Sequence, residues 1–154
     1  MGKLYTIILN SSQGTLVGDI RTVTYSFDWS QIPDKNYMVR MQFVTALFTT
    51  TNTYAVNILT DMGQLNTLVA SSPGGTTSSA AVYRYLGTAR YSGTGPNNWL
   101  WSDATFNVPS MLHGRPRSNI FNVFLTNNDA TNSLYASTNL PGTYTLVLSL
   151  EEMD

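Results

Sequence analysis

Apolar side chains recur at every second position along most of this sequence, and this period constrains the fold more than any other feature. In VTYSFDW (23–29), the apolar residues Val23, Tyr25, Phe27 and Trp29 alternate with polar ones. Successive side chains of an extended chain point to opposite faces, so this alternation indicates a half-buried β-strand. The three-to-four-residue spacing of an amphipathic helix is missing throughout.

The same alternation predicts eight or nine strands. They are expected at 4–10, 23–29, 37–48, 54–60, 66–71, 80–87, 98–109, 119–127 and 144–152. The segments between them are rich in Gly, Pro, Asn and Ser, which are typical of turns. The only helical turn is predicted at VPSMLHG (108–114), where Pro109 and Ser110 can begin one.

The length and the connections favour one architecture. The chain has 154 residues, of which 42% are hydrophobic, enough for one domain with its own core. Strands without helices must cover their apolar faces on one another, as a two-sheet sandwich or a closed barrel. Several long, uneven connections favour Greek-key crossovers. We therefore predict a single all-β domain over 1–154, an antiparallel β-sandwich of jelly-roll type.

Charge is scarce. Charged residues make up 11% of the chain, while 21 Thr, 15 Ser and 14 Asn make up about a third of it. A soluble monomer generally carries more charge, so we expect partners to cover part of this surface. The net charge of −1 offers no basic footprint for nucleic acid. Arg115 and Arg117 form the only basic cluster, which is typical of a solvated turn and is kept as a candidate interface.

Residues suited to catalysis or to metal binding are few. His113 is the only histidine and there is no cysteine, which excludes thiolate sites and the two or three histidines of a metal-binding jelly roll. Asp28 is predicted in mid-strand on the polar face, solvated or paired with Arg40. The segment TNNDATN (126–132) lacks the spacing of a calcium loop. We therefore predict no catalytic, cofactor-binding or metal-binding residue, no cofactor, and no enzyme activity.

The sequence also lacks the patterns of membrane insertion and of secretion. No segment reaches the roughly 18 apolar residues that a membrane span needs. The opening MGKLYTIILN lacks the long apolar region of a signal peptide. We expect neither insertion into a membrane nor a cleaved leader.

Trp99 and Trp101 in GPNNWLWSD (95–103) point to the same side of an extended chain. Tryptophan is frequent in cores and at interface hot spots, and an exposed pair can also stack on sugar rings. Three interpretations stay open for this pair: core, protein interface, or sugar-binding platform.

Three stretches resemble a known family. They are the opening LYTIILNSSQGT, the segment VTYSFDWSQIPDKNYMVRMQFVTA, and the close LPGTYTLVLSLEE. Together they resemble the small jelly-roll minor capsid proteins of large icosahedral double-stranded DNA viruses that infect algae and protists. The matching elements are 10–12, 27–29, 32–33 with Lys35 and Tyr37, and 144–151. The final LEE departs from the more typical F-E, and the resemblance does not extend over 60–118.

The resemblance implies a structural role, in which no site residues carry over. It implies a minor capsid, cement or vertex component that stabilises contacts between major capsomers. The expected location is the virion, assembled in the host cytoplasm. The expected partners are other capsid proteins, with a homo-oligomer also possible. The alternative is a lectin-like carbohydrate-binding β-sandwich that uses Trp99 and Trp101 as a stacking platform.

Overall fold

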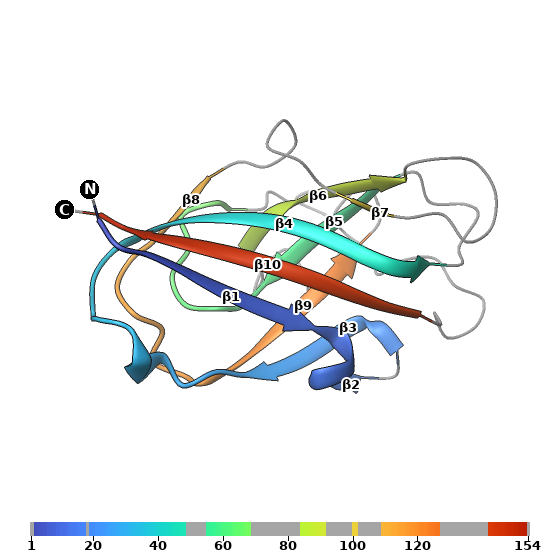
Figure 1. The fold of residues 1–154 in the computed structure, drawn as a ribbon, viewed down its shortest axis with the longest axis horizontal. Helices are drawn as coiled ribbons and strands as arrows, with labels where there is room; N and C mark the ends of the chain where they lie inside the picture. The colour runs from blue at the N-terminus through green and yellow to red at the C-terminus, as the bar shows by residue number, and fades with distance from the viewer. Residues whose placement is uncertain are drawn as a thin grey trace, which may run out of the picture.

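Figure 1 shows the computed structural model, which describes residues 2–17, 19–48, 55–68, 84–91, 100–101, 109–126 and 142–153. The strands within these residues are β1 (Leu4–Asn10), β2 (Thr15–Val17), β3 (Asp19–Ser26), β4 (Tyr37–Phe48), β5 (Ala55–Thr60), β6 (Arg84–Tyr91), β7 (Leu100–Trp101), β8 (Ser110–Leu112), β9 (Ile120–Thr126) and β10 (Gly142–Glu152). Two 3₁₀ turns, η1 (Ser11–Gln13) and η2 (Trp29–Gln31), complete the described elements.

The strands form two antiparallel layers. One layer has the order β1-β10-β4-β7, and the other has the order β6-β5-β9-β3-β2. The first and last strands of the chain are therefore neighbours, with β4 beside them, which is the Greek-key arrangement of a jelly roll. β8 also pairs with β4, near the start of that strand. The prediction of an all-β, jelly-roll sandwich is confirmed.

The two sides of the sandwich differ. β7 pairs with β4 of one layer and with β6 of the other, so this side is closed by hydrogen bonds. The ladder ends at β1 and at β2, which lie along the opposite side (Figure 1). We call this second side, formed by β1 and β2, the open side.

The core lies between the layers and follows the predicted alternation. Every second residue of β1, β9 and β10 is buried. These residues are Ile7 and Leu9 of β1, Phe121, Val123 and Leu125 of β9, and Tyr144, Leu146, Leu148 and Leu150 of β10. The intervening side chains are half-buried or exposed. The apolar period therefore selects which face of each strand enters the core.

The strand predicted at 23–29 ends early, at Ser26. Asp28 is not in mid-strand: its carboxylate caps η2 by accepting hydrogen bonds from the Ser30 backbone N–H (3.1 Å) and hydroxyl (2.6 Å). Of the two alternatives predicted for Asp28, solvated or paired with Arg40, the structure shows the first: Asp28 is exposed, and Arg40 donates to Glu151 instead (3.2 Å).

Two other predictions around β8 differ from the structure. The helical turn predicted at 108–114 is wrong, because Ser110–Leu112 is a strand whose Leu112 is buried opposite Tyr37 of β4. The strand predicted at 66–71 is reduced, in its described part, to an isolated bridge between Leu68 and Arg84. β2, which follows η1, lies outside every strand predicted from the sequence.

Candidate interaction surfaces

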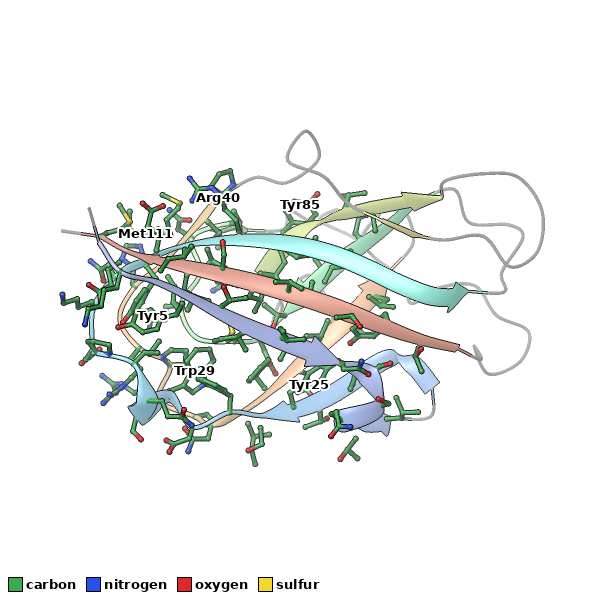
Figure 2. All side chains as sticks on the ribbon, in the orientation of Figure 1. Tyr5, Tyr25, Trp29, Arg40, Tyr85 and Met111 are labelled. Atoms are coloured by element: carbon green, nitrogen blue, oxygen red, sulfur yellow. The ribbon has the colours of Figure 1, made fainter. Side chains whose placement is uncertain are left out.

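A hollow of about 770 Å³ lies at the end of the sandwich where the chain termini meet. Three connections line it: η2 with the residues that follow it, the segment after β5, and the segment between β8 and β9. Figure 2 shows Trp29, which lines this hollow from η2, at the same end of the molecule.

The carboxylates around this hollow hold the connections together. Asp34 Oδ1 accepts a hydrogen bond from the Arg115 backbone N–H (2.9 Å). Asp61 accepts two, from the backbone N–H (2.6 Å) and the side-chain amide (2.9 Å) of Asn122. Hydrogen bonds from Ser30 lower the pKa of the Asp28 carboxyl, whereas a general acid needs a raised pKa. Asp34 and Asp61 therefore anchor their connections to residues distant in the sequence, whereas Asp28 caps its own turn.

The two candidate arginines have different surroundings. Arg115 is half-buried, and its guanidinium donates to the Ile32 carbonyl (3.0 Å). Arg117 is exposed and has no hydrogen-bond or ion-pair partner among the described residues. His113 is exposed as well, and its backbone N–H donates to the Gln64 carbonyl (3.0 Å). Of the two arginines, Arg117 alone presents a free charge to a partner.

The described residues form neither a metal-binding cluster nor a membrane-spanning helix. Within the described ranges, no three His, Asp or Glu side chains gather closely enough to hold a metal ion. No helix in those ranges is long and apolar enough to cross a membrane.

A glycine that lines the hollow lets neighbouring side chains pack closely against the backbone. Gly63 has a φ of +59°, and a Cβ there would lie 2.8 Å from a Leu112 methyl and 3.0 Å from Pro116. Gly114 also has a positive φ, of +75°, but a Cβ there would meet only Asp34, at 3.6 Å. The two glycines share the backbone requirement and differ in the space around them.

We expect Gly63→Ala to lower the free energy of unfolding by about 2 kcal/mol or more, and Gly114→Ala by about 1 kcal/mol. Both substitutions strain the backbone, but only the first also forces Leu112 or Pro116 to move. Urea denaturation of the two variants measures the difference. Equal losses would contradict this expectation and show that Leu112 and Pro116 move aside without a measurable loss of stability.

The open side carries exposed apolar side chains on both of its strands. Leu4 and Ile8 of β1 are 62% and 66% exposed, and Leu16 and Val17 of β2 are 47% and 60% exposed. Neither strand contains a charged residue or a proline, the residues that usually protect a sheet edge from unwanted pairing. In the described part of the chain, no strand pairs with the outer edge of β1.

The exposed apolar side chains of this side were not predicted from the sequence, although the sequence holds one signal of them. Ile7, Ile8 and Leu9 are three consecutive apolar residues. A strand that is half-buried needs an apolar residue only at every second position, so Ile8 has no core position to fill.

The structure describes little of the tryptophan pair. Trp99 lies outside the described residues, and Trp101 is described only through its backbone, which pairs with Val44 and Arg90. The choice among core, interface and sugar platform therefore stays a prediction.

The chain was also compared with known proteins. No family matches it, and no curated protein is found as a relative.

Proposed function

We propose that this chain is a non-enzymatic structural protein of a viral capsid. It acts as a minor capsid, cement or vertex component that stabilises contacts between major capsomers. Its partners are other capsid proteins, and its place is the virion assembled in the host cytoplasm. The observation that carries this proposal is the open side, with its exposed apolar side chains on unprotected edge strands.

An edge of this kind favours association. β1 leaves one row of backbone N–H and C=O groups without a strand partner in the described residues, next to the exposed Leu4 and Ile8. Such an edge is a template for pairing, and exposed apolar patches mark interaction sites. A neighbouring subunit that covers it satisfies the backbone groups and removes apolar surface from water.

Two further observations support a structural role over an enzymatic one. The acids around the hollow accept structural hydrogen bonds: Asp28 caps η2, and Asp34 and Asp61 bind distant segments of the chain. The low charge and the high content of Thr, Ser and Asn suit a subunit that is surrounded by others. The resemblance of both chain ends to minor capsid proteins supports a viral capsid as the assembly to which this subunit belongs.

The test is the protein content of purified particles. We expect this chain to co-sediment with the major capsid protein at a constant molar ratio through a density gradient. We also expect it to stay bound in high salt, because burial of apolar surface is not screened as surface charge contacts are. Its absence from the particles, or its release by salt alone, would contradict the proposal. A glycan array with the same purified protein tests the carbohydrate-binding alternative.

A further inference from the structure

We infer that the outer edge of β1 forms an antiparallel pair with the same edge of a second copy of this chain. The two-fold axis of this pair passes between the two Thr6 residues. The inference rests on the proposed use of the open side as a contact surface, and it names the partner.

The hydrogen-bond pattern shows which backbone groups face outward. Glu152 donates its backbone N–H to the Lys3 carbonyl (2.9 Å), so Lys3 faces β10. In an antiparallel ladder, every second residue bonds to the same neighbour. Tyr5 and the two alternate residues after it, Ile7 and Leu9, therefore face β10 as well. The residues between them direct their N–H and C=O groups to the open edge.

These outward-facing residues are Leu4, Thr6 and Ile8, and their side chains are all exposed. In an antiparallel pair centred on Thr6, Leu4 of one copy lies opposite Ile8 of the other, and Thr6 lies opposite Thr6. Each such pair joins two residues whose backbone groups face outward, so the new ladder can form its hydrogen bonds. Each pair also matches residue types, with two apolar contacts and one Thr–Thr contact, which are favourable across strands.

No other register fits as well. A register centred on Tyr5 or Ile7 places the apolar side chains opposite Thr6, Gly2 or Asn10. A register centred on Leu4 leaves Ile8 beyond the end of the partner strand. A register centred on Ile8 likewise leaves Leu4 beyond the end of the partner strand. The sequence of the edge is therefore self-complementary at one position only.

Charge does not oppose this pairing. Residues 4–10 carry no charge, and Lys3 would lie opposite Leu9 of the second copy, so the two lysines stand at opposite ends of the ladder. The net charge of −1 gives little repulsion between copies. The result is a closed two-fold contact, in which the β1 layers of the two copies form one continuous sheet.

Cysteine cross-linking tests the register directly, because the chain has no cysteine of its own. Hydrogen-bonded residues in an antiparallel pair have Cα atoms about 5.5 Å apart, within the range of a disulfide. We expect Thr6→Cys to give a reducible covalent dimer under mild oxidation. A mixture of Leu4→Cys and Ile8→Cys should cross-link about tenfold more than either variant alone.

Ser26→Cys, at an exposed position of β3 away from the proposed contact, is the matched control and should give no covalent dimer. Cross-linking of Thr6→Cys no greater than that of this control would overturn the inference. So would a mixture that cross-links no more than its components.

A proline variant tests the ladder by a second route. The Thr6 N–H is not used in the ladder with β10, so Thr6→Pro is compatible with the folded edge but removes a donor that an incoming strand needs. We expect it to raise the dimer dissociation constant about tenfold or more in sedimentation experiments. Thr6→Val keeps the N–H and should dimerise like the wild type. If Thr6→Pro dimerises normally, the inference fails. If Thr6→Pro does not fold, the cross-linking of the cysteine variants decides.

The outcomes separate the two proposals. A chain that is present in particles but does not cross-link through residue 6 contradicts the pairing and leaves the capsid role standing. A chain that cross-links as expected but is absent from particles contradicts the capsid role and leaves the pairing standing.

Discussion

Trp29→Ala is expected to lower the free energy of unfolding by about 3–5 kcal/mol, the largest effect of any single substitution proposed for this protein. Trp29 is 1% exposed, and its ring packs edge-on against Phe27, with centroids 4.8 Å apart. It also packs against Phe121 of β9 at 5.9 Å. Removing the indole leaves a cavity beneath η2, where these rings meet. Urea denaturation at low protein concentration measures the loss.

Trp29→Phe is the matched control. The indole Nε1 is buried and has no hydrogen-bond partner in the part of the chain that the structure describes. A phenyl ring at this position therefore loses volume but no hydrogen bond, and we expect a cost of about 1–2 kcal/mol. If Trp29→Phe costs as much as Trp29→Ala, then the indole N–H makes a contact on which the fold depends.

The second large effect is a loss of stability in alkaline solution. Tyr25 donates its hydroxyl to that of Tyr144 across the core (2.8 Å). Burial raises the pKa of Tyr25 to about 12, although the hydrogen bond to Tyr144 acts in the opposite direction. Burial raises the pKa of Tyr144 further above its ordinary value, with the nearby Tyr25 adding to the shift.

The direction of the effect follows from proton binding. Above pH 10 the unfolded chain releases protons from these tyrosines, while the folded protein keeps them. The stability is therefore fully present below pH 10 and falls as the pH rises towards 12. Each tyrosine adds a slope of up to about 1.4 kcal/mol per pH unit. Urea denaturation at a series of pH values measures this slope.

Tyr25→Phe separates this pair from the other tyrosines. It removes one of the two titrating groups of this pair, so we expect the slope between pH 10 and 12 to become shallower. At neutral pH the variant loses the hydrogen bond to Tyr144 and about 1–2 kcal/mol of stability. An unchanged alkaline slope would mean that Tyr25 does not keep its proton in the folded protein.

Strands with a long, regular alternation could be predicted from the sequence. The sequence predicted the bounds of β4, which are Tyr37–Phe48, and Tyr37, Val39 and Met41, which lie on one face of it, are buried as expected. β9 and β10 differ from their predicted ranges by one or two residues at their ends. In each case the pattern is a local property, because neighbouring side chains of a strand point to opposite faces.

Asp28 and Ser110–Leu112 show where local patterns fail. A polar residue between apolar ones fits a strand, but the same Asp28 also fits the cap of η2, and the turn into β4 decides between them. Pro109 and Ser110 are suited to begin a helical turn, but pairing with β4 draws Ser110–Leu112 into the sheet. Propensity is weak compared with the burial of Leu112 in the core.

The contact surfaces depended most on the tertiary structure. The sequence by itself determined an all-β, charge-poor chain, and it identified Arg115 and Arg117 as a pair. Only the fold made Arg115 a partner of Ile32 and left Arg117 exposed. Only the fold placed β1 at the end of a ladder, with Leu4 and Ile8 uncovered. The physical reason is that alternation sets which face of a strand is buried, whereas the edge that stays open depends on which distant strands pair.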